Sequence, residues 1–206
     1  MVTTRNSRAD VVAAAGTLFA ERGYHGTSMR DLGRELGLLG SSLYAHVESK
    51  QDLLVEVVEE GARLFQDSAD RALAGAGTAA DRLLGLVAGH IDVVLDNKDV
   101  VRTFLNEARM LDEEHRGRVI AARDAYEAAF RSVIAEGAAN GTFRPGTDPK
   151  MASILILSIL NAVERWYRPN GTLDRDGLVD AIFTAATRGI APGRLASVSA
   201  EPSEEV

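Results

Sequence analysis

The segment Gly40-Ser41-Ser42-Leu43-Tyr44-Ala45-His46-Val47-Glu48-Ser49-Lys50 decides how the N-terminal part of the chain folds. It places small and polar side chains on one side of a short helix and turns Leu43 and Val47 to the other side. A helix that reads DNA bases needs such groups at its N-terminal end, with Tyr, Lys and backbone amides on the flanking phosphates. The segment is equally compatible with a solvated helical turn, so the surrounding sequence must decide.

Two helices are predicted upstream of this segment. The first spans about residues 8–22 and ends at Gly23, which can adopt a left-handed cap, and the second spans about residues 29–36. The turn Leu38-Leu39-Gly40-Ser41 joins the second helix to a third over about residues 42–47. Two short helices joined by a four-residue turn that contains glycine are typical of a helix-turn-helix.

Three helix starts carry the sequence Ser-x-x-Asp, a relative of the capping box. A serine at this position accepts a hydrogen bond from a free backbone N–H, and the aspartate suits the positive end of the helix dipole. The three starts are Ser7 to Asp10, Ser28 to Asp31 and Ser49 to Asp52.

Helical periodicity continues through the rest of the chain, and no alternating segment is long enough to predict a strand. The fold class is therefore all-α, with about nine helices. We expect a helix-turn-helix DNA-binding domain of three helices over residues 1–50, a larger helical ligand-binding and dimerisation domain over residues 51–190, and a disordered tail over residues 191–206. In the larger domain one helix begins near Lys50, and others span about residues 79–95, 100–108, 113–139, 149–166 and 173–188.

The charge of the chain is unevenly distributed. The net charge is −7 over 206 residues, but residues 1–50 carry six Lys/Arg against five Asp/Glu, so the acidity lies in the larger part. This asymmetry permits DNA binding at the N-terminal end, because the electrostatic footprint of a DNA-binding protein is local.

Composition also bears on compartment and chemistry. The absence of cysteine excludes disulfides, thiolate metal sites and a cysteine nucleophile, and it fits a cytoplasmic location. No signal-peptide pattern is present at the N-terminus, and the longest apolar stretch, Met151–Leu160, has about half the roughly 20 residues that a membrane span requires. We expect neither a membrane partner nor a metal or other cofactor.

Four segments at linked spacings resemble the DNA-binding domain of TetR-type (AcrR-like) regulators: Ala13–Tyr24, Gly26–Leu32, Gly40–Tyr44 and His46–Lys50. The resemblance implies a ligand-responsive regulator that binds double-stranded, pseudo-palindromic operator DNA as a homodimer, and repression is the usual mode of this family. It implies phosphate contacts at Thr27 and Lys50 and a recognition surface in the quoted segment. The DNA-binding residues that we expect are Thr27, Ser28, Arg30, Ser41, Ser42, Tyr44, His46 and Lys50.

The same resemblance implies that the last two helices form the dimer interface. The apolar run from Ile154 to Leu160 gives one of these helices two apolar faces, one to pack inward and one to meet a second copy. A helix buried within its own monomer would show a similar pattern. The interface residues that we expect are Leu155, Ile159, Val179, Ile182 and Phe183.

A small-molecule effector is expected among the middle helices, where the family has its pocket. The candidates combine aromatic walls with a few polar groups, although each would also suit a packed core. They are His90, Phe104, Arg109, Tyr126, Phe130, Asn161 and Trp166.

The segment Arg165–Gly171 is similar to one in TetR-type regulators of sterol and fatty-acid catabolism, some of which respond to acyl-CoA thioesters. Five arginines are available for the phosphates of such a ligand, but we favour a solvated face on which they pair with Asp112, Glu113, Glu114 and Glu127. These arginines are Arg102, Arg109, Arg116, Arg118 and Arg123.

Two other classes of protein compete with this interpretation. An all-α enzyme is disfavoured because the chain lacks the nucleophile-elbow, zinc-protease and phosphate-loop motifs, and because its four histidines lie far apart in sequence. A helical adaptor that binds only protein is the second alternative, and it would show no salt-dependent affinity for DNA.

Overall fold

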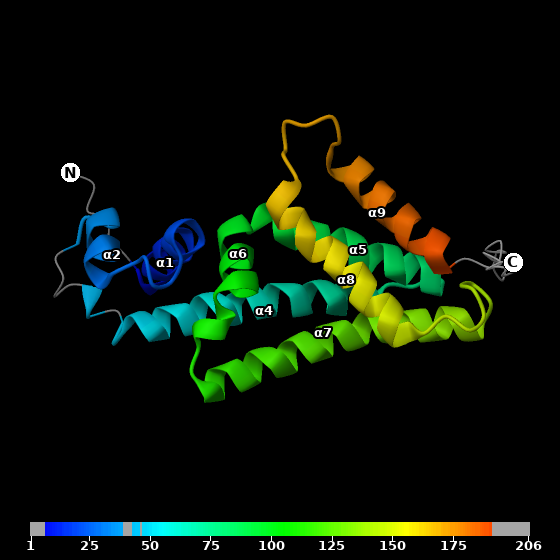
Figure 1. The fold of residues 1–206 in the computed structure, drawn as a ribbon, viewed down its shortest axis with the longest axis horizontal. Coiled ribbons are helices and arrows are strands. Elements are labelled where there is room, and N and C mark those ends of the chain that lie inside the picture. The colour runs from blue at the N-terminus through cyan, green and yellow to red at the C-terminus, as the bar shows by residue number, and fades with distance from the viewer. Residues whose placement is uncertain (1–6, 39–42, 46, 191–206) are drawn as a thin grey trace, which may run out of the picture.

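The computed structural model describes residues 7–38, 43–45 and 47–190. In these residues it contains eight α-helices, one 3-10 turn and no strand, which confirms the predicted all-α class (Figure 1). Residues 42 and 46 of the third predicted helix and the tail over 191–206 lie outside the described residues, whereas Leu43 and Val47 of that helix are buried as predicted. The elements are α1 (Arg8–Arg22), α2 (Met29–Glu35), α4 (Lys50–Ala74), α5 (Ala79–Asp96), α6 (Lys98–Asn106), η1 (Ala108–Met110), α7 (Glu113–Ala139), α8 (Pro149–Trp166) and α9 (Arg175–Ile190).

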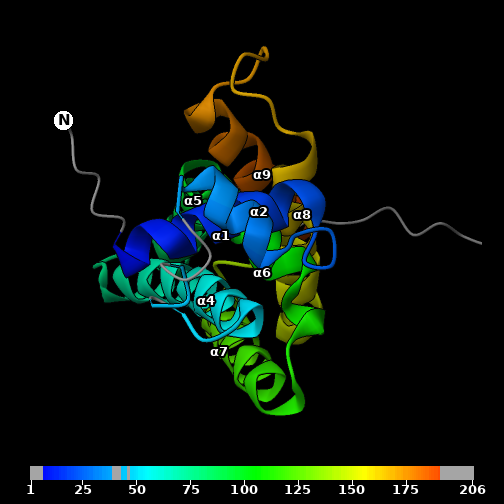
Figure 2. The same ribbon diagram turned by 90° about the vertical axis from the view of Figure 1, so that its left-hand side faces the viewer.

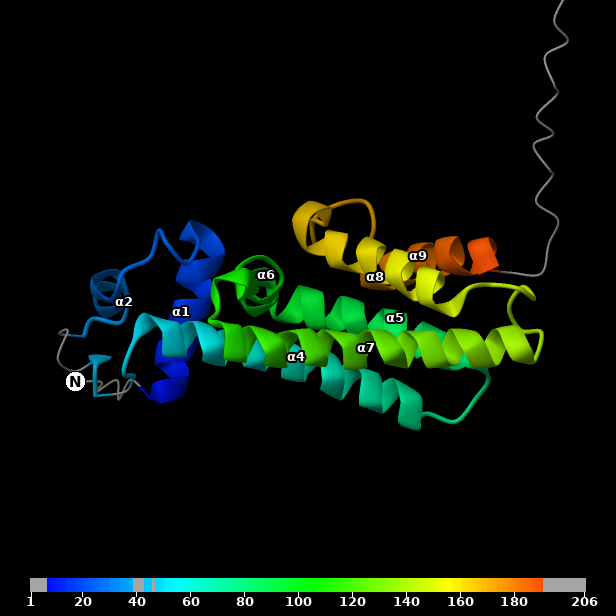
Figure 3. The same cartoon turned by 60° about the horizontal axis from the view of Figure 1, so that its bottom comes forward.

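The helices form two parts joined by α4. Helices α1 and α2 lie at one end of an elongated molecule, and Figure 2 shows them facing the viewer when the molecule is seen from that end. The rest of the chain forms the body, in which α8 and α9 lie on one side of α5 while α4 and α7 lie on the other (Figure 3). Helix α4 contacts α1 in the small part and α5, α6 and α7 in the body, so one rigid element spans both.

Helix boundaries follow the capping chemistry read from the sequence. Ser7 with Asp10 and Ser28 with Asp31 form reciprocal capping boxes, and the Ser49 side chain accepts from the backbone N–H of Asp52. A third capping box, Thr78 with Asp81, starts α5 and was not among the predicted motifs. The sequence placed the helix after α5 two residues too late, since α6 begins at Lys98, and the last helix two residues too early, since α9 begins at Arg175.

A close approach between α4 and α6 depends on a glycine. A Cβ atom placed on Gly61 would lie 2.8 Å from the Cβ of Phe104, which is shorter than side chains tolerate. Gly61 is itself buried, and Phe104 lies in the continuous apolar core that extends from α1 through the body. The absent side chain at Gly61 therefore lets α6 pack directly on α4.

Within the part of the chain that the structure covers, no helix combines the length and apolarity needed to cross a membrane.

Candidate DNA-binding surface and ligand cavity

The predicted DNA-binding residues gather at the end of the molecule formed by α2 and the start of α4. Ser28 and Arg30 are exposed at the N-terminus of α2, and Tyr44 is exposed in the segment between α2 and α4. Ser41, Ser42 and His46 lie outside the described residues.

Lys50 and Thr27 hold the connection between α1 and α2. The Nζ of Lys50 donates to the backbone carbonyls of Tyr24 (2.9 Å) and Thr27 (2.8 Å) and lies 4.1 Å from the centre of the Tyr24 ring. The hydroxyl of Thr27 donates to the carbonyls of Leu18 (3.2 Å) and Gly23 (3.0 Å). Both side chains therefore stabilise the start of the DNA-binding domain.

These contacts change what can be expected of the two predicted phosphate contacts. Thr27 is only 2% exposed and its hydroxyl faces the interior, so a side-chain contact between Thr27 and a phosphate is not supported by this conformation. An ammonium group has three N–H donors, of which Lys50 uses two on carbonyls. Lys50 is half-buried and keeps one donor for an external acceptor.

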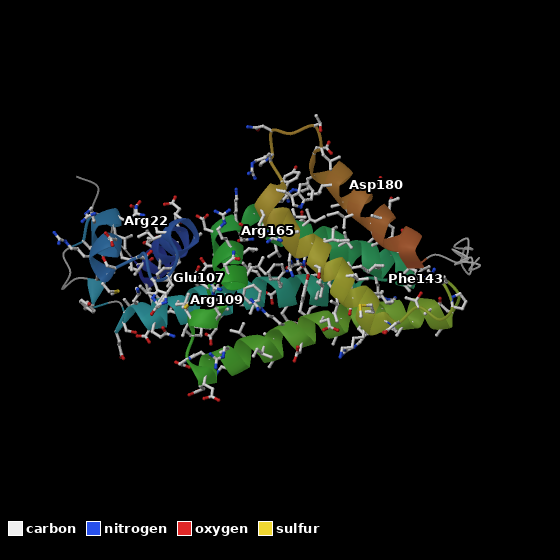
Figure 4. The ribbon with its side chains drawn as sticks, viewed as in Figure 1. Arg22, Glu107, Arg109, Phe143, Arg165 and Asp180 are labelled. Atoms are coloured by element: carbon white, nitrogen blue, oxygen red, sulfur yellow. The ribbon has the colours of Figure 1, made fainter. Side chains whose placement is uncertain are left out.

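Helix α6 connects the body to α1 through polar contacts. The hydroxyl of Thr103 donates to the Gly16 carbonyl (3.2 Å), and the hydroxyl of Thr17 donates to Asp99 (2.8 Å). Just after α6, the carboxylate of Glu107 accepts from the backbone N–H of Tyr24 (3.2 Å), and Figure 4 shows Glu107 beside the DNA-binding part. A displacement of α6 must therefore be accommodated by α1 and by the turn that follows it.

A cavity of about 470 Å³ lies in the body, walled by α4, α5, α6, α7 and α8. This size is within the range of small-molecule sites. The residues that line it are Ala62, Phe65, His90, Phe104, Leu105, Asn106, Ala122, Arg123, Asp124, Tyr126, Glu127, Ile154, Leu157, Ser158, Asn161, Glu164 and Arg165.

One end of the cavity is buried and aromatic. The ring of Phe65 lies 4.7 Å from that of His90, 5.6 Å from that of Phe104 and 5.4 Å from that of Tyr126, measured between centroids. All four side chains are buried. An apolar part of a ligand would gain burial against this wall.

His90 is the polar group at this aromatic end. Its Nδ1 is hydrogen-bonded to the hydroxyl of Tyr126 at 3.0 Å, while its Nε2 has no hydrogen-bond partner among the residues that the structure describes. The residue is 1% exposed, and burial lowers its pKa from 6.5 to about 3. Burial also raises the pKa of the Tyr126 hydroxyl. Both groups are therefore neutral at physiological pH.

Charged groups lie elsewhere on the cavity wall. The carboxylate of Glu164 is buried and paired with Arg102, because a buried charge needs such a partner. The guanidinium of Arg123 donates to the Phe104 carbonyl (2.6 Å) and lies 4.7 Å from the centre of the Phe104 ring, and burial lowers its pKa. Arg165 is exposed and stands on α8 near α6 (Figure 4). The cavity thus combines an aromatic end, where His90 and Tyr126 are neutral and Arg123 packs on Phe104, with further charged groups along its wall.

Four of the seven predicted ligand residues line this cavity: His90, Phe104, Tyr126 and Asn161. The other three do not. Phe130 is fully buried behind Tyr126, with ring centroids 5.5 Å apart. Arg109 lies in η1 (Figure 4), and Trp166 is exposed at the end of α8.

Several lining residues were not predicted as ligand contacts. Phe65 belongs to the apolar stripe of α4 and had no feature to distinguish it from the core. Glu164 carried a usable signal, because it lies three residues after Asn161 and so shares a helix face with it. The five arginines considered for the phosphates of an acyl-CoA do not share one environment. Arg123 lines the cavity. Arg118 pairs with Glu114, as in the favoured solvated arrangement, and also with Glu59.

The predicted dimer residues occupy α8 and α9 with unequal exposure. Leu155 is 57% exposed and Ile159 is 43% exposed. Val179 and Phe183 are half-buried, and Ile182 is buried. An apolar strip on α8 is therefore uncovered in the single chain.

These features define a class of protein: an all-α regulator whose DNA-binding part is joined by one long helix to a body with a ligand cavity. Residues 11–57 match the family model described as bacterial regulatory proteins, tetR family, and residues 76–190 match the tetracyclin repressor-like C-terminal domain. The chain belongs to the TetR family of transcriptional regulators. It is not an enzyme, and the family binds operator DNA and small effectors.

Individual relatives agree with this assignment. The HTH-type transcriptional repressor KstR2 of Mycolicibacterium smegmatis is 26% identical over 184 residues, which cover 89% of this chain and 90% of the relative. The structure of the ketosteroid transcriptional regulator KstR2 of Mycobacterium tuberculosis superposes with a TM-score of 0.85 at 24% identity, covering 94% of this chain and 98% of the other. The structure of AibR with isovaleryl coenzyme A and operator DNA gives a TM-score of 0.81 at 24% identity, covering 87% and 97%. The last two likenesses establish the fold.

Proposed function

We propose that this regulator is a dimeric repressor that binds pseudo-palindromic operator DNA and is released when an apolar effector, such as an acyl-CoA thioester, fills the cavity in its body. The observation that carries the proposal is the position of α6, which lines the cavity with Phe104 and hydrogen-bonds α1 through Thr103. The KstR2 relatives are repressors, and the AibR structure contains both an acyl-CoA and operator DNA.

The proposed DNA contacts divide by their place in the structure. Arg30, Ser28 and Tyr44 are exposed and available to bases or phosphates, and Lys50 keeps one ammonium donor for a phosphate. Ser41, Ser42 and His46 complete the proposed recognition surface. Thr27 supports the surface from within by fixing the turn between α1 and α2.

The effector would act by changing the spacing between α4 and α6, which both line the cavity. A ligand that prefers a different spacing between α4 and α6 would shift the arrangement of α1 and α4, and the differential affinity for the two arrangements sets the extent of release. Because Gly61 lets Phe104 pack directly on α4, little space separates the two helices. A change at Phe104 is therefore transmitted to both.

The size and chemistry of the cavity suit the acyl end of an acyl-CoA. The aromatic end around Phe65 and Phe104 would take the acyl group, and Arg123 and Arg165 would meet anionic groups. This assignment differs from the solvated face favoured from sequence, because it gives Arg123 a place on the cavity wall and adds Arg165, which was not among the five arginines.

Dimerisation would cover the exposed strip on α8. Leu155 and Ile159 would lie at its centre, with Val179, Ile182 and Phe183 of α9 beside them. We expect Leu155→Glu to produce monomers in sedimentation experiments, because a charge in an apolar interface has no partner. Ile120→Glu on α7 is the matched control, since Ile120 is similarly exposed at 52% and lies outside the proposed interface. An unchanged dimer in Leu155→Glu would contradict this interface.

The DNA-binding proposal is tested by fluorescence anisotropy with the protein's own promoter at two salt concentrations. We expect salt-sensitive binding that Tyr44→Ala weakens by about tenfold or more, since a buried phosphate or base contact contributes about 1–3 kcal/mol. Lys150→Met, at the start of α8, removes a charge far from the proposed surface and is expected to leave affinity unchanged. Addition of an acyl-CoA series is then expected to release the DNA. No preference for promoter over random DNA, or no release by any acyl-CoA, would contradict the respective part of the proposal.

A further inference from the structure

The most unusual polar atom of the body is the Nε2 of His90. It is buried, it belongs to a residue that lines the cavity, and it has no hydrogen-bond partner within the described part of the chain. A buried polar group without a partner destabilises a protein, so its presence requires an explanation. A ligand that completes the hydrogen bond provides one.

The number of hydrogens available to His90 and Tyr126 decides which of the two donates the hydrogen bond between them. If Nδ1 carried the proton and donated to the oxygen of Tyr126, two groups would remain unmatched: the Tyr126 O–H and the Nε2 lone pair. If the Tyr126 hydroxyl donates to Nδ1, only one group is unmatched, the N–H at Nε2. The second arrangement leaves fewer buried polar groups without partners and is therefore favoured.

The surroundings of His90 select an uncharged acceptor. The rings of Phe65, Tyr126 and Phe104 form the adjoining wall, and the two residues of the hydrogen-bonded pair are both neutral. The guanidinium of Arg123 lies against the far ring of this wall, Phe104, and already donates to the Phe104 carbonyl. A carboxylate or phosphate at His90 itself would therefore lose its hydration and meet one neutral donor there, which is unfavourable. A carbonyl oxygen needs only that one donor.

We propose that the Nε2–H of His90 donates a hydrogen bond to an uncharged carbonyl oxygen of the effector, and that the apolar skeleton next to this carbonyl packs on Phe65 and Phe104. The effector class is thus an apolar ketone, ester or thioester, in contrast to a hydrocarbon or a molecule whose buried end is ionised. This inference rests on the proposed role of the cavity as the effector site and adds a specificity-determining residue to it.

The proton position can be measured without any ligand. In the full-length protein labelled with ¹⁵N-histidine, long-range ¹H–¹⁵N correlation spectra distinguish a protonated ring nitrogen from an unprotonated one. We expect His90 to be neutral at pH 7, with the proton on Nε2. His90→Gln identifies the resonance by its disappearance. A proton on Nδ1, or a charged ring, would overturn the proposal.

Binding is then measured with probes that differ only in the carbonyl. The probes are 2-decalone with decalin and 2-undecanone with undecane, followed by calorimetry or thermal shift. We expect at least one ketone to bind about tenfold or more tightly than its hydrocarbon and to shift the Nε2 resonance, because the hydrocarbon leaves the donor unpaired.

Variants separate the hydrogen bond from the shape of the site. His90→Gln keeps a neutral N–H donor and is expected to retain part of the preference for the ketone, whereas His90→Leu is expected to bind ketone and hydrocarbon equally. His115→Leu, at the start of α7 and outside the residues that line the cavity, is the matched control and should keep the full preference. Equal binding of ketone and hydrocarbon by the wild type, including no binding by either pair, would overturn the inference.

Promoter DNA in the same samples distinguishes this failure from failure of the proposed function. A ketone that binds through His90 without changing DNA affinity would contradict the proposed release mechanism and support the assignment of His90. DNA release by a hydrocarbon as strong as that by its ketone would support the release mechanism and contradict the role of His90.

Discussion

Two regions that pack against α4 differ in whether their buried polar groups have hydrogen-bond partners. At its N-terminal end, two donors of Lys50 and the hydroxyl of Thr27 are engaged by backbone carbonyls of α1 and of the turn that follows it. Further along, at the cavity beside Phe65, the Nε2 of His90 has no partner among the described residues. Hydrogen bonds to several backbone groups fix one conformation, whereas a buried donor without a partner leaves free energy for a ligand to supply. The region around Lys50 is therefore held in one conformation, whereas the cavity around His90 can gain stability when a ligand binds.

The largest effect is expected from removing the hydrogen bonds of Lys50. Lys50→Met removes the charged donor from the carbonyls of Tyr24 and Thr27. We expect the free energy of unfolding to fall by about 2 kcal/mol in total, because a charged hydrogen bond contributes about 1.5–3 kcal/mol and water can replace part of the loss at this half-buried position. DNA affinity should fall at least as much, because the turn and a proposed phosphate contact are lost together. Denaturant titration and anisotropy measure the two effects. Lys150→Met is the control, and equal losses in both variants would refute the special role of Lys50.

The next effect concerns the junction between α4 and α6. Gly61→Ala brings a Cβ to 2.8 Å from that of Phe104, and we expect a loss of about 2 kcal/mol, typical of overpacking in a core. Gly117→Ala in α7 has no atom within 4 Å of the new Cβ and should stabilise the protein by up to about 1 kcal/mol through helix propensity. Thermal unfolding measures both. The junction would prove adaptable if Gly61→Ala were neutral.

The third effect tests the buried histidine through pH. The folded-state pKa of His90 is lowered to about 3, below the unfolded value of 6.5, so the unfolded state binds the proton and stability falls as the pH decreases below about 6.5. Between pH 7.5 and 5.5 this contribution is about 1.4 kcal/mol. His90→Gln should flatten the profile by that amount in urea titrations. The aspartates with lowered pKa values, such as Asp31 and Asp81, act at lower pH and are common to both proteins. Parallel profiles would show that the pKa of His90 is the same in the folded and unfolded states, contrary to the lowered pKa that burial produces.

The smallest effect is expected from removing the hydrogen bond between α6 and α1. Thr103→Val preserves the shape of the side chain and removes its hydrogen bond to the Gly16 carbonyl, so we expect a loss of about 1 kcal/mol. Effector-induced release of DNA should weaken while DNA affinity without effector changes little. Titration of DNA with and without acyl-CoA measures this coupling, and Thr187→Val, whose hydroxyl bonds within α9, is the control. Undiminished coupling would show that α6 acts through apolar packing alone.

Sequence predicted the helices well because their ends are decided locally. Ser7 and Ser28 cap their helices as their spacing to an aspartate indicated, and α7 and α8 begin and end at the predicted residues. Thr78 with Asp81 was overlooked although it carries the same chemistry. A search for threonine as well as serine would have found it.

The cavity was only partly predictable because its lining depends on how helices pack. Tyr126 and Phe130 lie four residues apart on the same face of α7, yet Tyr126 lines the cavity and Phe130 is buried behind it. Periodicity cannot separate two such positions, since both face the core. The missing partner of His90 is likewise a property of the packed body and leaves no trace in the sequence.

Because α4 is long, it acts as a lever between the cavity and the DNA-binding part. Phe65 lies fifteen residues from Lys50 on the same helix, a distance of about 22 Å at 1.5 Å per residue. A rotation of about 8° around Phe65 would displace the Lys50 end by about 3 Å, and the two-fold symmetry of the proposed dimer would apply the displacement twice. A major groove about 12 Å wide cannot follow such a shift at two half-sites together. A modest adjustment in the body is thereby amplified into loss of register on DNA.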